Sequence, residues 1–155
     1  MKTNEAIKQI QSFLGLTVFH ASAGRVVIER IKKEFETPLS EELIEYIELT
    51  APSEDVDFET VGNPMTIYSF SRLGSTQDGF NFNSVKNEKI EDWNPDWFLI
   101  ADEGADPVII DLSKKEMKVM QASHGMGEWD FHPIADSIGQ FLLCQAAIHY
   151  AMTNW

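Results

Sequence analysis

The segment WNPDWFLIADEGADPVIIDLS, residues 93–113, decides the fold, because two short apolar runs flank a polar turn. The runs WFLIA (97–101) and PVIID (107–111) are rich in β-branched and aromatic residues, a composition typical of buried strands. Gly104 between them supplies the positive φ angle that tight turns often need. The segment therefore predicts a β-hairpin. The acidic residues at its turn are Asp102, Glu103 and Asp106.

These acidic residues raise the question of a metal site. A calcium loop of the EF-hand type needs oxygen donors at alternating positions and a glutamate at its twelfth position, and Ala105 and Pro107 interrupt such a series. Magnesium needs fewer protein ligands, so the pattern leaves it open. Acidic residues are common in turns. We therefore interpret the cluster as a hairpin turn and predict neither a metal nor a cofactor.

Further strands are predicted on both sides of this hairpin. Residues 116–122 (EMKVMQA) alternate and would complete a β-meander. Residues 55–61 (DVDFETV) and 65–70 (MTIYSF) have the alternation and the composition of two earlier strands. The segment 71–91 is rich in Gly and Asn, and we expect it to be a loop with one short strand at residues 79–82.

Helical spacing of apolar residues marks the two ends of the chain. It predicts helices at 4–14, 25–35 and 37–52, the third with Thr37 or Ser40 as N-cap and Pro52 as its end. Helices, then strands, then a closing helix is the order of an α+β fold. We predict N-terminal helices, a central, mainly antiparallel sheet and a C-terminal helix packed on that sheet.

The closing helix is predicted within residues 135–152. Ser137 and Gln140 have the spacing of a capping box. An apolar stripe at steps of three and four residues is expected to be buried against the sheet, which would make Cys144 an inert core thiol. The stripe consists of Ile134, Ile138, Phe141, Cys144, Ile148 and Met152.

Length and composition indicate one domain spanning residues 1–155. The lone cysteine excludes an intramolecular disulfide and fits a reducing compartment. The N-terminus lacks the apolar core of a secretory signal, and no apolar run has the length of a membrane span. The sequence therefore predicts a cytoplasmic protein.

The tryptophans are expected to anchor the core around the meander or, where exposed, to contact a partner. They are Trp93, Trp97, Trp129 and Trp155.

The charge of the chain is strongly acidic, with a formal net charge of −13. Binding to nucleic acid or to anionic lipid depends on Lys and Arg, so neither is expected. Residues 34–59 contain ten acidic residues and no Lys or Arg. Such a run is either a solvated surface or a field that attracts a basic protein.

Catalytic motifs are absent from the sequence: it contains no G-x-S-x-G elbow, no phosphate-binding glycine loop and no H-E-x-x-H pair. The segment HGMGEWDFH, residues 124–132, remains as an alternative. A small metal-dependent hydrolase could use its side chains, although Gly125 and Gly127 favour a loop. The candidate ligands are His124, Glu128, Asp130 and His132.

The strand and helix motifs resemble the SUKH superfamily of Smi/Knr-type homologues. The family's opening helices are similar to residues 28–49, and the resemblance leaves 1–25 as an N-terminal helical extension. Two features depart from the family pattern: TAPSEDVD replaces an Asn-Gly pair, and Ile138 stands where a Phe is expected. The motif positions are Trp97, Gly104, Asp106, Ile109, Asp111, Leu112, Lys118, Val119, His124, Ile134, Ala135, Ser137, Phe141 and Leu142.

The resemblance implies a protein-binding module and not an enzyme. Bacterial members are mostly regarded as immunity proteins that neutralise polymorphic toxins, many of them nucleases, and a basic toxin domain would be attracted to an acidic surface. A regulatory scaffold is the alternative, and the oligomeric state stays open. The candidate partner-binding residues are Glu41, Glu45, Asp55, Asp57, Glu59, Asp102 and Glu103.

Overall fold

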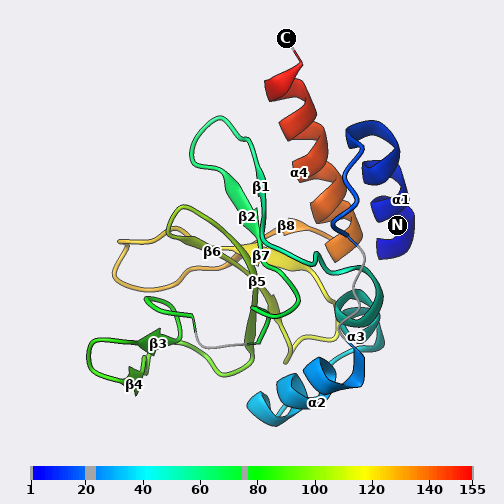
Figure 1. The fold of residues 1–155 in the computed structure, drawn as a ribbon. Coiled ribbons are helices and arrows are strands. Elements are labelled where there is room, and N and C mark those ends of the chain that lie inside the picture. The colour runs from blue at the N-terminus through cyan, green and yellow to red at the C-terminus, as the bar shows by residue number, and fades with distance from the viewer. Residues whose placement is uncertain (1, 20–23, 75–76, 155) are drawn as a thin grey trace.

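The computed structural model describes residues 2–19, 24–74 and 77–154 and has the predicted α+β architecture (Figure 1). Its helices gather on one side of a central sheet, and a small hairpin extends from the other side. Trp155 lies outside the described residues, as do Met1 and residues 20–23 of the predicted N-terminal extension. The helices are α1 (Thr3–Leu14), α2 (Gly24–Glu34), α3 (Glu41–Glu45), its continuation as a π-helical turn η1 (Tyr46–Thr50), and α4 (Ile138–Thr153).

The central sheet has six antiparallel strands in the order β1-β2-β5-β6-β7-β8. Neighbours in the sheet are consecutive in the chain except at β2 and β5, between which the separate β3–β4 hairpin is inserted. The predicted meander is therefore confirmed and extended. The strands are β1 (Val56–Phe58), β2 (Met65–Ile67), β3 (Phe82–Asn83), β4 (Glu88–Lys89), β5 (Trp97–Glu103), β6 (Asp106–Asp111), β7 (Val119–Gln121) and β8 (His132–Ala135).

The hairpin predicted from residues 93–113 is β5–β6, in which Glu103 pairs with Asp106 around a two-residue turn. Gly104 has a φ of 65°, as the turn required. A Cβ at this position would come within 2.7 Å of the Asn63 side-chain nitrogen. Both the backbone angle and the available space therefore favour glycine at this position.

The helix-covered face of the sheet forms the main core. Alternation and register place apolar side chains from five strands on this face. Ring contacts reach it from the helices, such as that between Phe58 and His149 of α4, whose centroids are 5.6 Å apart. The buried residues of this face include Phe58, Ile67, Phe98, Val108, Ile110 and Val119.

The opposite face, called the outer face below, is apolar at its centre, where Leu99 and Ile109 are buried. Aromatic side chains from the flanking loops pack together beside it. The rings of Trp97 and Phe131 are 4.6 Å apart, and those of Trp93 and Trp97 are 5.2 Å apart. Trp93, Trp97 and Trp129 thus anchor the meander as predicted.

Two strand predictions need correction. His132 was expected to end a loop, and Ile134 and Ala135 were expected to belong to the closing helix, but residues 132–135 form the edge strand β8, which pairs with β7. Its first three residues are exposed and include Pro133, so its sequence has no alternating apolar signal. The short strand expected at 79–82 is found at Phe82–Asn83 and pairs with β4, which the sequence did not indicate.

The ends of the helices agree with the predicted caps. Ser40 Oγ accepts a hydrogen bond from Leu43 N–H, and Ser137 Oγ accepts one from Gln140 N–H; both bonds are 3.1 Å long. The Gln140 side-chain oxygen also accepts from Asp136 N–H, so it reaches back to the backbone before the helix.

The buried stripe predicted along α4 is only half correct. Ile138 and Phe141 are buried, but Cys144 is exposed, so the prediction of a core thiol is wrong. The reason is geometric: α4 packs against both the sheet and α1 (Figure 1), and its buried side carries Leu142 and Ala146. His149, further along the helix, still contacts Phe58 of β1, so Cys144 is exposed because it lies on the other side of the helix. The other exposed members of the predicted stripe are Ile134 at 37%, Ile148 at 40% and Met152 at 43%.

Candidate functional site

Two of the predicted acidic residues lie in one row across three strands of the outer face. Asp57 of β1 is opposite Thr66 of β2, and Thr66 is opposite Asp102 of β5. Directly opposed residues share a face of the sheet, and neighbouring strands are about 4.8 Å apart, which puts the two carboxylates within about 10 Å of each other. Thr66 Oγ1 donates to Asp57 Oδ1 at 2.6 Å and fixes that end of the row.

Asp55 joins the same cluster from the segment before β1. Its carboxylate accepts a hydrogen bond from Ser69 N–H at 2.8 Å and an ion-paired hydrogen bond from Arg72 Nη1 at 2.6 Å. The Arg72 guanidinium lies 3.9 Å from the centre of the Tyr68 ring, in a cation–π contact. We call Asp55, Asp57 and Asp102 the acidic row, with Arg72 as its local cation.

Tyr68 connects the buried sheet to this row. Its hydroxyl donates to Asp102 Oδ2 at 2.6 Å. Burial is the main cause that raises the pKa of both groups; the Asp102 pKa is lowered by the Tyr68 hydrogen bond and raised again by Asp55 and Asp57. The three carboxylates and one guanidinium give the row a formal excess of two negative charges, so an incoming cation would relieve the repulsion between the acids.

The predicted residues Glu41 and Glu45 do not join the row. Both are exposed on α3, which lies well apart from the β1–β2 hairpin in Figure 1. Between them in sequence, Glu42 is partly buried, and burial raises its pKa. The acidic run at 34–59 is therefore divided between a helix and a strand edge, and the two parts lie on different regions of the surface.

Glu59 and Glu103 make local contacts beside the row. The Glu59 N–H donates to His149 Nδ1 at 2.9 Å, which ties the end of β1 to α4. The Glu103 carboxylate accepts from Gln121 Nε2 at 3.2 Å and from a threonine hydroxyl. Strand alternation turns Glu103 toward the face opposite to that of Asp102.

Asp106 binds the loop that contains the alternative metal ligands. Its Oδ1 accepts from His124 N–H at 2.8 Å and lies 2.7 Å from His124 Nδ1. Partial burial acts to raise the Asp106 pKa, but the contacts with His124 outweigh it and lower the pKa. His124 is thus tied to the β5–β6 turn.

The metal-site alternative has no geometric support in the described part of the chain. Within residues 2–19, 24–74 and 77–154, no group of three or more His, Cys, Asp or Glu side chains could hold a metal ion. Glu128, Asp130 and His132 line a shallow hollow of about 300 Å³ beside Ser123 and Met126.

The remaining family-motif residues have structural contacts. Asp111 follows the buried part of β6, and its carboxylate accepts from the Ser113 N–H and hydroxyl at 2.9 and 2.6 Å. Phe141 is a buried residue of α4, and Ser137 is the N-cap of the same helix. These residues terminate strands and anchor helices, as Gly104 and Trp97 also do.

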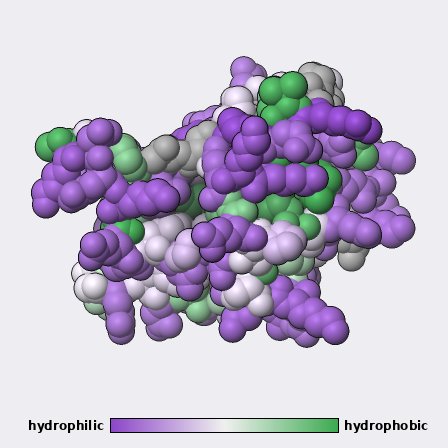
Figure 2. Space-filling view, turned by 90° about the horizontal axis from the view of Figure 1, so that it is seen from below, coloured by the Kyte–Doolittle hydropathy of each residue, from purple (hydrophilic) through white to green (hydrophobic). Residues whose placement is uncertain are grey.

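Two hollows next to α2 were not predicted from the sequence. A cleft of about 410 Å³ between the end of α2 and the β3–β4 hairpin is lined by Phe35, Phe82, Trp93 and Trp97, with Lys33 and Lys89 among its charged residues. Its lining combines residues 33–35 with residues between 74 and 97, so no local sequence signal could reveal it. Seen from the α2 side, the surface is mostly hydrophilic with small hydrophobic patches (Figure 2).

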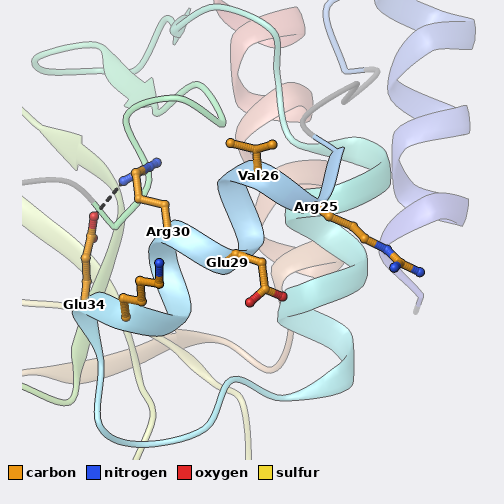
Figure 3. A pocket seen from close by; sticks show the side chains of 6 residues that line it. Arg25, Val26, Glu29, Arg30 and Glu34 are labelled. Atoms are coloured by element: carbon orange, nitrogen blue, oxygen red, sulfur yellow. Dashed lines mark hydrogen bonds and ion pairs between the residues drawn. The ribbon is translucent and has the colours of Figure 1, made fainter.

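The second hollow, about 620 Å³, lies over the exposed side of α2 (Figure 3). Arg30 turns toward Glu34, with a 2.8 Å ion pair, and its other nitrogen donates to the Leu73 carbonyl at 3.0 Å. Arg25 points away from this pair in Figure 3. Because these side chains point in different directions, they could not contact one bound ligand together.

The fold and the acidic row define the class of protein: an α+β protein with a helix-covered sheet and a cluster of carboxylates on its other face. The sequence matches the profile of the SMI1 / KNR4 family (SUKH-1) over residues 24–144, and the chain belongs to this family. α1 and the second half of α4 lie outside the matched range. No curated protein matches the sequence.

Among the described residues, no helix is both long enough and apolar enough to cross a membrane.

Proposed function

We propose that this protein is a non-catalytic, cytoplasmic binding module that acts as an immunity protein and neutralises a basic toxin domain. The acidic row carries the proposal, and membership of the SUKH-1 family supports it. The carboxylates of the row are held in place by Thr66, Ser69, Arg72 and Tyr68. Fixed carboxylates lose little conformational entropy when they pair with a cation, which favours binding.

A nuclease is the toxin class that this surface suits best, because its active surface is basic and the row offers spaced negative charges in place of phosphates. Asp55, Asp57 and Asp102 would make direct contacts. Glu41, Glu45, Glu59 and Glu103 would contribute to the wider field that speeds association. A regulatory scaffold is the alternative, and it would bind a partner other than a toxin.

The proposal predicts a toxin gene beside the gene for this protein, and the test uses the purified toxin domain that such a gene would encode. We expect Asp57→Lys to weaken toxin binding on the order of tenfold or more at low salt, because it places a cation within the row. Glu91→Lys is the matched control: it makes the same change in charge at an exposed residue outside the row. Binding is measured by titration calorimetry.

Two results would overturn the proposal. One is equal loss of affinity in Asp57→Lys and Glu91→Lys, which would reduce the effect to net charge. The other is an affinity that does not change between low and near-molar salt, where the screening length falls to about 3 Å. Growth of toxin-producing cells gives a second measurement, since wild type but not Asp57→Lys should protect them.

A further inference from the structure

The cleft between the end of α2 and the β3–β4 hairpin contains side chains that neither the core nor the acidic row accounts for. Its volume of about 410 Å³ lies within the range of roughly 300–1,000 Å³ that is usual for small-molecule sites. Phe, Trp, Ile and Pro side chains make up much of its lining, which is also typical of such sites. α2 and the hairpin lie at one end of the molecule in Figure 1, whereas β1, which carries Asp57, lies towards the other.

Phe82 of β3 has an aromatic ring that the fold does not use. It is partly exposed and lines the cleft together with Trp97 of β5. Within the described ranges, the Phe82 side chain is neither packed against the core nor in contact with another aromatic ring. Such a ring contributes little to folding, but it could pack against the flat face of an aromatic ligand.

Three polar side chains of the cleft have hydrogen-bond donors that remain available. Lys33 and Lys89 are exposed, and in the part of the chain that the structure describes neither of them forms an ion pair. The Asn81 side-chain oxygen accepts from Gln77 N–H at 2.7 Å, so only its NH₂ group is left for a ligand. A set of two ammonium groups and one amide donor favours a ligand that carries an anionic acceptor.

The α2 side of the cleft is held in place by its own contacts. The Glu34 carboxylate, which also lines the cleft, pairs with Arg30 at 2.8 Å, and a second Arg30 nitrogen donates to the Leu73 carbonyl at 3.0 Å. A Cβ on Gly74 would come within 2.9 Å of both Glu34 Oε2 and Ile31 Cγ1, so the loop packs closely against the helix. The charge of Glu34 is therefore compensated, and a wall that is already ordered loses little entropy when a ligand binds.

We propose that this cleft binds a small aromatic molecule that carries an anionic group. The flat ring of the ligand packs against Phe82 and Trp97, the partly exposed aromatic side chains of the lining. Its anionic group accepts from the ammonium groups of Lys33 and Lys89. The site is independent of the acidic row, whose carboxylates suit ligands of the opposite charge.

Charge and strand length favour a small molecule over a macromolecule. A nucleic acid would be repelled by the net charge of −13, whereas a small anion feels mainly the charges within the screening length of about 8 Å at physiological ionic strength. An extended peptide gains affinity by adding a strand to a sheet edge. β3 and β4 have two residues each and offer little backbone for such pairing.

The first test is an NMR titration of the full chain with naphthalene-2-carboxylate and with its neutral analogue, naphthalene-2-methanol. The carboxylate should shift the indole N–H signal of Trp97 and the amide signal of Phe82, with a Kd on the order of 1 mM or below. The amide signals of Asp57 and Thr66 in the acidic row should not move. The alcohol should bind at the same place about tenfold more weakly, because it has no charge to pair with the lysines.

The second test removes the two lysines of the cleft. The double variant Lys33→Gln/Lys89→Gln should bind the carboxylate about tenfold more weakly than wild type and should bind the alcohol like wild type. The matched control is Lys32→Gln/Lys86→Gln, which makes the same change in charge on the same two elements at lysines that do not line the cleft. It should bind both ligands nearly as well as wild type.

The third test removes the aromatic surface. Phe82→Ala should weaken the carboxylate and the alcohol alike, and thermal unfolding verifies that the variant is folded.

Three results would overturn the inference. They are the absence of a Trp97 shift at about 10 mM carboxylate, equal affinities of wild type for the carboxylate and the alcohol, and equal losses of affinity in the two double lysine variants. The inference does not depend on the toxin partner: Lys33→Gln/Lys89→Gln should not weaken toxin binding, and Asp57→Lys should bind the carboxylate at least as well as wild type.

Discussion

The two faces of the central sheet differ although the same strands build both. Phe98 of β5 lies on the helix-covered face, where it is buried, whereas Asp102 of the same strand lies half-buried on the outer face. On the first face the side chains are apolar and contribute stability. On the second face the apolar packing gives way to polar side chains at the row, where Asp57 of β1 and Asp102 of β5 flank Thr66 of β2. The helix-covered face thus consists of buried apolar side chains, whereas the acidic row on the outer face consists of charged side chains.

The largest effect is expected when the ring of Phe98 is removed from the helix-covered face. Phe98→Ala should reduce the free energy of unfolding by about 3–5 kcal/mol, because it leaves a cavity in a packed core. Phe98 is fully buried, and its ring is 5.1 Å from that of Phe35. Urea denaturation gives the value. Val61→Ala, at a residue that is 92% exposed, should change it little, and similar losses in the two variants would contradict the assignment of the core.

The next test addresses the hydrogen bond between Tyr68 and Asp102 on the outer face. Tyr68→Phe removes the hydroxyl that donates to Asp102, and we expect a loss of about 1–3 kcal/mol in unfolding free energy at neutral pH. The partly buried carboxylate then has one donor fewer. Tyr150→Phe, at an exposed tyrosine of α4, is a control that should have a small effect.

The same variant should change how stability depends on pH. Burial raises the Asp102 pKa above 3.8, so the folded state holds this proton more tightly than the unfolded state. The stability from protonated Asp102 is therefore present at acid pH and is lost as pH rises through the raised pKa. Since the Tyr68 hydrogen bond lowers that pKa, Tyr68→Phe should lose more stability than wild type over this rise. Parallel pH profiles would show that the bond does not affect Asp102.

The sequence predicted the helix-covered face well for a physical reason. Apolar periodicity reports burial, and burial dominates where a strand packs beneath helices. The β5–β6 hairpin, the α+β order and both serine caps followed from such local patterns. The periodicity of α4 was equally clear, but it could not show which side of the helix faces the sheet and α1.

The acidic row was only partly predictable. Asp55, Asp57 and Asp102 were among the candidates, but their proximity depends on the pairing of β2 with β5 across an insertion of about thirty residues. Tyr68 and Arg72 were missed because an apolar strand pattern does not report which hydroxyl or guanidinium meets a carboxylate. Glu41 and Glu45 were grouped with the row only because they are close in sequence.

A smaller effect is expected where the core helix α4 begins. Ser137→Ala removes the acceptor for the Gln140 N–H and should destabilise the protein by about 1 kcal/mol. This change tests whether the helix-covered face depends on the caps of its covering helix. Ser123→Ala, in an exposed loop, should leave the unfolding midpoint unchanged, and equal midpoints for both variants would show that the cap contributes nothing.

The smallest effect on stability should come from the acidic row itself. Asp57→Asn keeps an oxygen that can accept from the Thr66 hydroxyl, and Asp57 is exposed, so the unfolding free energy should change by about 0.5 kcal/mol or less. The same change removes one charge from the proposed binding surface and should weaken toxin binding at low salt. Calorimetric titration and urea denaturation of one preparation measure both quantities. A large loss of stability with unchanged toxin binding would contradict this assignment, because Asp57 would then stabilise the fold and would not contribute to binding the partner.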